Sequence, residues 1–312
     1  MIKIRRYSAK DAMSWDAFVD ASKNGTFLLK REYMDYHSDR YKDHSLLFYN
    51  DEELIALLPA SEHGSELRSH GGLTYGGVIC TQTMKQHKMN DCIEALLSYM
   101  QDNKLERIIY KAIPYIYHRY PCQEDLYALW KYNARLVRRD VASVMEFSNF
   151  SIKMSKGRKA QIARARREGI SISQSIDFDA FLTLENQVLT KYHNAKATHT
   201  AAELDLLYSR FPNNIRLYVA THERKIEAGV LLFIFDNMVH TQYMASSDFG
   251  RENGALDLII STIIDEYKGQ KSYLDFGTSM EDAGRILNNG LISQKEGFGA
   301  RSIIYDFYEL RA

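Results

Sequence analysis

The sequence is poor in the residues that typify secreted or membrane-embedded proteins. Its 312 residues include three cysteines and four prolines. The cysteines are odd in number and form no Cys-x-x-Cys pair, which argues against a disulfide framework. The longest apolar run, at residues 230–235, is far shorter than the roughly 20 residues that span a bilayer. Few prolines and no low-complexity stretch also leave little room for a disordered linker.

Charge and the N-terminal residues further narrow the class of protein that this sequence encodes. Forty basic and forty acidic residues cancel, which excludes a nucleic-acid surface over the whole chain but leaves local patches open. Residues 1–7 run directly into polar sequence with no signal-peptide pattern. We therefore expect a soluble, cytoplasmic protein with reduced thiols. The sequence carries no signal for an oligomeric state.

The same order of elements occurs twice along the chain. Three strands are expected at 46–49, 54–60 and 72–79, then a helix over 89–100 and a strand at 107–112. About 170 residues later the expected strands are 216–220, 226–235 and 238–246, then a helix over 255–267 and a strand at 273–276. Helical sequence precedes each set. The repeat predicts an α/β (α+β) protein of two lobes, residues 1–149 and 150–312, each a mixed, mostly antiparallel sheet flanked by helices.

A glycine-containing turn at residues 250–254 separates an apolar strand from an amphipathic helix. Glycines allow backbone N–H groups to face a ligand, the helix start adds unpaired donors, and Arg251 adds a charge. This pattern predicts a site for a diphosphate, although an ordinary strand-to-helix turn explains the glycines equally well. The residues expected there are Ser246, Gly250, Arg251, Gly254 and Ala255.

Two further segments are candidates for substrate binding. Residues 153–167 hold seven positive charges with no acid, so we expect a helix that contacts phosphate through Arg158 and Arg164. The alternative is a solvated helix face. Residues 70–77 hold four glycines beside polar side chains, which indicates a loop that binds a polar substrate, or else a tight connection within a sheet. The loop residues expected to contact substrate are His70, Gly71, Thr74 and Tyr75.

Together these segments resemble the FemAB-like branch of the GNAT superfamily, whose members carry two GNAT lobes and include peptidoglycan-bridge aminoacyltransferases. The pattern Arg251-x-x-Gly254 is similar to the GNAT acyl-donor turn, although Leu256 departs from the third position. Residues 155–170 are similar to the family's basic helix, and 275–277 with 290–299 to its Asp-Phe-Gly and Phe-Gly blocks. Residues 177–216 lack the long coiled-coil arm of the bridge-forming members. The resemblance implies two tandem GNAT-like lobes.

The resemblance also implies direct attack of an acceptor amine on a bound acyl donor. No nucleophile elbow, phosphate-binding loop or metal-ligand spacing occurs, so no metal is expected. The candidate proton-transfer residues are Tyr243, Asp275 and Lys295, with His240 and Glu296 also considered. A turn-capping carboxylate explains Asp275 equally well. We expect these residues and the 70–77 loop to share a cleft between the lobes.

We therefore expect an acyltransferase, GNAT-like, that moves an acyl group, acetyl in the simplest case, from acetyl-CoA or another acyl-CoA to an amine. The implied acceptor is a nucleotide- or lipid-linked amino sugar bearing phosphate, in cell-surface polysaccharide biosynthesis of the cell envelope. One alternative is a Fem-type aminoacyl or peptidyl transferase that uses aminoacyl-tRNA on a peptidoglycan precursor. Another is a non-catalytic binding protein on a degenerate GNAT fold.

Overall fold

The computed structural model describes residues 2–148, 153–193 and 196–312 and divides the chain into two compact units. One comprises the residues up to Asp140 together with Ile304–Ala312, and the other comprises Val141–Ile303. The boundary expected at residues 149–150 lies outside the described residues. The strands β8 (Arg135–Glu146) and β16 (Arg301–Arg311) each contribute residues to both units. Every described helix is too short or too polar to cross a bilayer.

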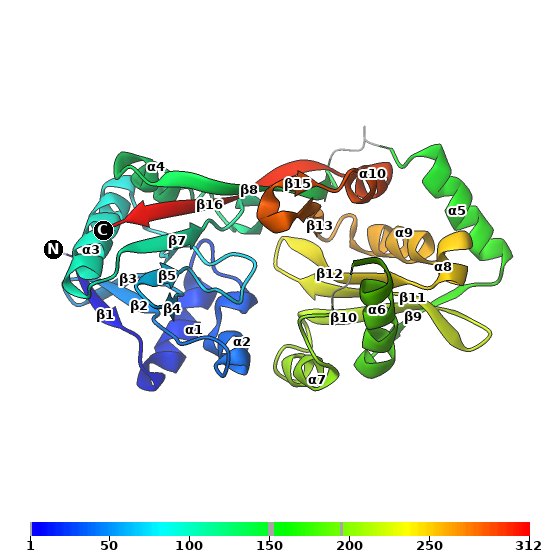
Figure 1. The fold of residues 1–312 in the computed structure, drawn as a ribbon, viewed down its shortest axis with the longest axis horizontal. Helices are drawn as coiled ribbons and strands as arrows, with labels where there is room; N and C mark the ends of the chain where they lie inside the picture. Colours follow the sequence, from blue (N-terminus) through cyan, green and yellow to red (C-terminus); the bar gives the residue numbers. More distant parts are fainter. Residues whose placement is uncertain (1, 149–152, 194–195) are drawn as a thin grey trace. The chain divides into compact units, whose positions relative to one another are not determined.

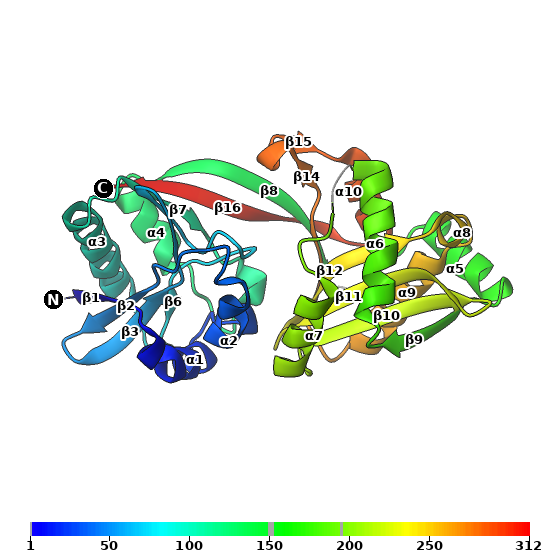
Figure 2. The same cartoon turned by 60° about the horizontal axis from the view of Figure 1, so that its bottom comes forward.

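The first unit contains two small sheets. In chain order its elements are β1 (Ile2–Arg6), α1 (Ala12–Ala21), α2 (Arg31–Met34), β2 (Leu46–Asn50), β3 (Glu53–Leu58), β4 (Ser61–His63), β5 (Glu66–Arg68), β6 (Ile79–Cys80), α3 (Gln86–Asp102), β7 (Arg107–Lys111) and α4 (Glu124–Lys131). One sheet has the antiparallel order β1-β2-β3-β6, and the other runs β4-β5-β7-β16, where β7 pairs in parallel with β5. Figure 1 labels these elements except β6, which Figure 2 labels.

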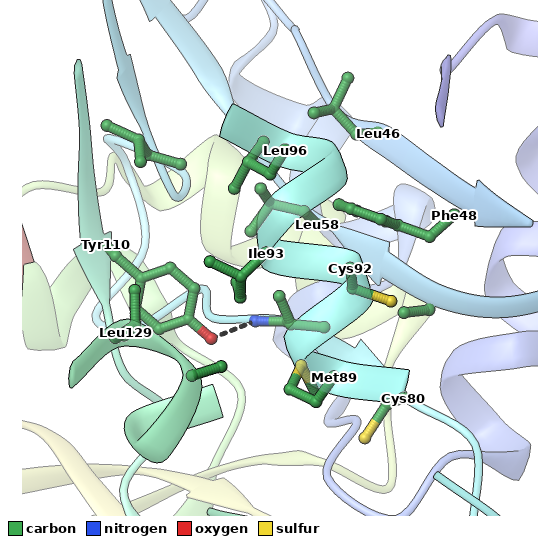
Figure 3. Close-up of a cluster of buried hydrophobic side chains, with 14 of the residues drawn as sticks. Leu46, Phe48, Leu58, Cys80, Met89, Cys92, Ile93, Leu96, Tyr110 and Leu129 are labelled. Atoms are coloured by element: carbon green, nitrogen blue, oxygen red, sulfur yellow. Dashed lines mark hydrogen bonds between the residues drawn. The ribbon is translucent and has the colours of Figure 1, made fainter. Parts of the chain in front are cut away.

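The core of this unit forms where α3 packs on the antiparallel sheet. Apolar residues recur every three or four positions along α3, which puts Met89, Ile93 and Leu96 on one buried face against Leu46 and Phe48 of β2 (Figure 3). Local periodicity therefore predicts α3 correctly. The three cysteines are buried and form no disulfide.

The third strand expected in the first unit is wrong for most of its length. Only Ile79 and Cys80 pair with β3, and the residues from 71 to 78 form turns and a loop. Hydrogen bonds of side chains, and not pairing with a neighbouring strand, hold this loop in place. The Tyr75 hydroxyl donates to Thr26 Oγ1 at 3.0 Å, and the Tyr110 hydroxyl accepts the Val78 N–H at 2.7 Å (Figure 3).

The second unit is one larger sheet with helices on both faces. Its elements are α5 (Lys156–Arg167), β9 (Ser171–Ser175), α6 (Phe178–His193), α7 (Ala201–Arg210), β10 (Ile215–His222), β11 (Lys225–Ile234), β12 (Met238–Ser246), α8 (Asp248–Glu252), α9 (Ala255–Tyr267), β13 (Tyr273–Thr278), β14 (Met280–Glu281), β15 (Ile286–Leu287) and α10 (Asn289–Gly297). The strand order is β9-β10-β11-β12-β13-β8, antiparallel except for the parallel pair β12–β13. Figure 1 shows α9 on one face and α7 on the other, and Figure 2 shows α6 crossing β11 and β12.

The two units repeat one topology. The series β1-β2-β3-β6, α3, β7 corresponds to β9-β10-β11-β12, α9, β13, at an offset of about 170 residues. In both series the strand after the long helix pairs in parallel with a neighbour, β7 with β5 and β13 with β12. The predicted fold class is confirmed: two α/β lobes with mixed, mostly antiparallel sheets. The described part of 177–216 holds the ordinary helices α6 and α7, as expected.

Candidate active site

The strands β12 and β13 pair only at their beginnings. Met238–His240 align with Tyr273–Asp275, whereas on its other side β13 pairs with β8 from Tyr273 to Thr278. A bulge on the opposite edge of β12, at Gln242, changes its register with β11. The two strands therefore separate just after His240 and Asp275, which places these side chains at the point of separation.

His240 and Asp275 form a buried, oriented pair. The His240 Nδ1 and Asp275 Oδ2 atoms are 2.8 Å apart, and Asp275 Oδ1 accepts the Gly277 N–H at 2.7 Å. Asp275 is completely buried. An ionised carboxylate on Nδ1 keeps the proton on that nitrogen, so the lone pair of a neutral ring lies on Nε2. The pair has the arrangement of a histidine general base with its orienting carboxylate.

Gly277 permits this pair to form. Its φ of +70° lies in the left-handed region, and a Cβ atom there would lie 3.2 Å from His240 Cε1. The turn that ends β13 thus supplies an N–H to the carboxylate and room for the imidazole ring. Asp275 therefore accepts the backbone N–H of the turn, as a capping carboxylate does, and also contacts the His240 ring.

Lys295 fixes α10 beside the same turn. Its Nζ donates to the carbonyls of Gly277, at 3.0 Å, and Thr278, at 2.8 Å, and the residue is 3% exposed. Burial lowers its pKa to about 8, against the opposing effect of Asp275. The structure thus brings the predicted residues Asp275 and Lys295 together.

Tyr243 faces a different partner. Its hydroxyl lies 2.7 Å from His199 Nδ1 and accepts the His199 backbone N–H at 3.3 Å. Burial raises the pKa of Tyr243. Those contacts tie β12 to the segment before α7, and the catalytic role expected for Tyr243 stays a prediction.

A pocket of about 550 Å³ opens further along β12. It brings Ser246 of β12 and Arg251 of α8, which the sequence assigned to the donor site, together with Arg158 of α5, which it assigned to substrate binding. Tyr192 and Leu256 also line it. Met244, which also lines it, is four residues from His240, or roughly 13 Å along a strand. The pocket and the His240–Asp275 pair therefore lie along the same strand.

The two arginines of the pocket are held by neighbouring side chains. Arg158 Nη1 lies 2.8 Å from Asp257 Oδ1 in the first turn of α9. Arg251 Nε donates to the Ser246 carbonyl at 3.2 Å, and its guanidinium lies 4.0 Å from the centre of the Tyr192 ring. These contacts orient both guanidinium groups, and a role for them in phosphate binding stays a prediction.

The open turn expected at residues 250–254 is wrong. Residues 248–252 form α8, and the N–H groups there bond within the protein: Gly250 to Ser247 Oγ at 3.0 Å, and Arg251 to the Ser247 carbonyl at 2.9 Å. Gly254 has φ +73°, and a Cβ atom on it would overlap the Gln161 carbonyl of α5. The positive φ of Gly254 is what the alternative of an ordinary turn requires, and close packing on α5 adds a second reason for glycine. Ala255 is buried as the first residue of α9.

The basic helix has one inward and one outward side. Its N-cap Ser155 accepts the Arg158 N–H, while Ile162 and Ala165 are buried toward α9. Arg164 is exposed, as expected for a surface that meets phosphate or solvent. Exposed with it are Lys153, Lys156, Lys159, Arg166 and Arg167. Within the described ranges, none of these six lies within ion-pair distance of an acid.

The 70–77 loop is tightly packed within the first unit. His70 has φ +48° and is 3% exposed, and burial lowers its pKa well below the usual value. Cβ atoms on Gly71 and Gly72 would press on the ring of Tyr41. Thr74 is exposed and Tyr75 is buried. Close packing explains these glycines, and substrate binding by the loop stays a prediction, as does a cleft shared with Asp275.

His240 was considered for proton transfer but was not among the three catalytic residues predicted from the sequence. Alternation along the strand placed it opposite Thr241 but gave no partner, because Asp275 is 35 residues away. The parallel register of β12 and β13 joins them, and no local pattern in the sequence gives that register. Among the residues described, no three His, Cys, Asp or Glu side chains are grouped to hold a metal ion.

No protein-family model and no curated protein matched the sequence. Among solved structures, the chain is similar to FemX, with a TM-score of 0.69 and 10% identity over 99% of this chain and 97% of that one. It is also similar to the C-terminal domain of a protein described as a lysylphosphatidylglycerol synthetase from Agrobacterium fabrum, with a TM-score of 0.66 and 13% identity over 97% and 92%. A tandem GNAT protein from the clavulanic acid biosynthesis pathway gives 0.56 and 8% over 100% and 98%.

These likenesses confirm the resemblance expected from the sequence. The chain has the fold of a FemAB-like relative of the tandem GNAT proteins.

Proposed function

We propose that this protein is a transferase that moves an acyl group from an activated, phosphate-bearing donor to an acceptor amine. The observation that carries the proposal is the His240–Asp275 pair at the point where β12 and β13 separate, on the same strand as a pocket with two oriented arginines. The fold shared with FemX and tandem GNAT proteins supports it.

The residues allow a direct transfer. The acceptor nitrogen attacks the donor carbonyl carbon, a C–N bond forms, and the bond from that carbon to the leaving group breaks. His240 Nε2 takes the proton of the attacking amine, while Asp275 stabilises the imidazolium that results. Lys295, buried beside Asp275, holds the turn after Asp275 through two carbonyls, and stabilisation of the developing oxyanion by its charge is part of this proposal. The proton on His240 then passes to the leaving group.

An aminoacyl ester of tRNA is the donor that the geometry favours. The 12-residue helix α5, roughly 18 Å long, carries five exposed cations, and Lys153 precedes it; within the described ranges none of these six meets an acid. Such a row suits a polynucleotide backbone. The N–H groups of Gly250 and Arg251 are engaged within the protein, and Asp257 lies in the first turn of α9, so little backbone remains for a coenzyme A diphosphate.

Acyl-CoA remains the second candidate donor, because the pocket brings Ser246, Arg251 and Leu256 together at the start of α9. The acceptor we propose is a primary amine on a phosphate-bearing precursor of the cell envelope. An amino sugar linked to a nucleotide or lipid fits the acyl-CoA donor, and a peptidoglycan precursor fits aminoacyl-tRNA.

The test compares the two donors directly. Purified protein is incubated with tRNA charged with labelled amino acids, or with labelled acetyl-CoA, and with a nucleotide-linked amino sugar or a peptidoglycan-precursor peptide. We expect label to move from charged tRNA to an amine. Transfer from acetyl-CoA alone would establish the second candidate. Binding of ligand without transfer from either donor would support a non-catalytic binding protein.

A further inference from the structure

Glu185 is a buried acid whose carboxylate is incompletely paired. It lies in α6, is 5% exposed, and its Oε2 atom has no hydrogen-bond partner in the described part of the chain. Burial raises the pKa of Glu185 to about 7, and no cation among the described side chains offsets this loss of water. A buried, unpaired carboxylate destabilises a fold, which makes its presence informative.

Glu185 lies one turn of α6 before Val188, which lines the pocket. Residues 185, 188 and 192 share one face of α6, because they are spaced by three and four positions. Val188 and Tyr192 line the pocket that also holds Arg251. One turn before Glu185, the Phe181 ring lies against Gly229 of β11, so this face of α6 is the one that meets the sheet.

The other buried acids of this unit have partners, which sets Glu185 apart. Asp257 pairs with Arg158, and Asp275 bonds to His240 and the Gly277 N–H. Glu227 pairs with Lys225 at 3.1 Å and accepts from the Ser247 hydroxyl. A buried carboxylate that lacks a cation among the described residues is complementary to a small cation with N–H donors, and a primary ammonium group is the simplest such ligand.

We propose that Glu185 receives a primary ammonium group of a substrate bound at this pocket. The inference rests on the proposed transferase function, and two sources share the chemistry. One is the amino group of an aminoacyl donor, and the other is the acceptor amine before it loses its proton. An acetyl donor has no such group, so the first source would assign an aminoacyl group to this pocket.

Calorimetry at pH 8 tests the inference with four probes. They are 3′-alanylamino-3′-deoxyadenosine and its N-acetylated form, and glucosamine and N-acetylglucosamine. We expect the free amine of one pair to bind at least tenfold more tightly than its acetylated partner, and we expect Glu185→Gln to abolish that preference. The exposed Glu223 provides a matched control, since Glu223→Gln changes charge equally without touching the pocket. Preference in the adenosine pair identifies the donor, and preference in the sugar pair identifies the acceptor.

Two outcomes overturn the inference: equal binding of amine and amide in the wild type, or an unchanged preference in Glu185→Gln. Thermal denaturation shows whether that isosteric variant is folded, and burial of an uncharged amide predicts that it is. Because this experiment measures binding without turnover, its result is independent of whether the proposed transferase function is correct. A preference that depends on Glu185 without any acyl transfer would refute the transferase alone, and transfer with no role for Glu185 would refute this inference alone.

Discussion

At the scale of single residues, the second unit contains buried acids that differ in what neutralises them. Asp257 and Asp275 each meet a cationic or polar partner, whereas Glu185 lacks a cation. Partnered acids hold structure in place, and the partner of Asp275 is also the candidate base. Glu185 makes the stability of the fold depend on pH, and on our proposal it also recognises substrate.

His240→Ala should lower kcat by a factor on the order of 10² to 10⁴, the usual contribution of a general base. Asp275→Asn should also lower kcat, because an amide in place of the carboxylate no longer stabilises the imidazolium. The pH dependence of kcat/KM, measured for the wild type and both variants, checks this. His222→Ala, which removes a ring stacked on Phe249, is the control. Wild-type kcat in His240→Ala would rule out the base.

The stability of the protein relative to Glu185→Gln should fall as pH rises. Folding raises the pKa of Glu185 from 4.5 to about 7, so the folded state holds a proton that the unfolded state has lost between these values. The difference in unfolding free energy therefore decreases from about pH 4.5 to about pH 7, by on the order of 3 kcal/mol. Urea denaturation at several pH values measures it. A difference that does not vary with pH would show that Glu185 has an unrecognised cationic partner.

At the scale of elements, the site depends on how closely α5 and α9 approach. The backbone of α5 covers Gly254, and Arg158 of α5 pairs with Asp257 in the first turn of α9. Ile162 and Ala165 are buried in the core that α5 shares with α9. The helix that presents cations outward is therefore anchored by apolar packing and by one inward arginine.

Gly254→Ala should destabilise the protein by at least about 2 kcal/mol, because the new Cβ meets the Gln161 carbonyl and φ is positive. The matched control is Gly157→Ala in α5, where a Cβ meets nothing within 4 Å. That change should stabilise by roughly 0.5–1 kcal/mol, since alanine favours helix. Chemical denaturation of both variants provides the comparison. Equal stability of the two variants would contradict the packing argument.

Reversing two exposed cations of α5, Lys159→Glu with Arg164→Glu, should weaken tRNA binding and leave the thermal midpoint nearly unchanged. If both contact phosphate, the slope of log K against log salt should fall by roughly 1.4 to 1.8 in magnitude. The control reverses two exposed lysines of the first unit, Lys3 and Lys104. Filter binding over a salt series gives the slope. Equal slopes for the variant and the control would mean that α5 is a solvated face.

At the scale of the whole molecule, the C-terminal strand completes the first unit. Residues 307–311 of β16 pair with all five residues of β7, and Leu310 joins the core around α3. The unit is therefore assembled from both ends of the described chain, so its stability includes contacts between residues about 200 positions apart.

Removal of Ile304–Ala312 should selectively weaken the first unit. The amides of β7 would lose a strand partner, and hydrogen exchange there should accelerate by several orders of magnitude. Exchange in β10 and β11 should stay slow, because neither strand pairs with β16. Mass spectrometry of exchanged peptides resolves the two regions. Unchanged protection of β7 after truncation would show that its pairing with β16 adds little.

Local patterns in the sequence were enough to predict the repeat, the helices α3, α5 and α9, and the strands β10 to β12. Helical and strand periodicity involves residues within a few positions of one another, and in these elements burial agrees with it. The basic charge of α5 is equally a local property. Its inward and outward sides follow from packing against α9.

Tertiary structure decided the remaining features, because they depend on contacts between distant residues. Gly250 and Gly254 suggested an open turn, but Ser247 capping makes α8 and the Gln161 carbonyl covers Gly254. Pairing of His240 with Asp275 requires the parallel register of two strands. Recognition of Glu185 as a carboxylate without a cation among the described residues requires knowledge of its spatial neighbours, because burial raises its pKa with no opposing partner.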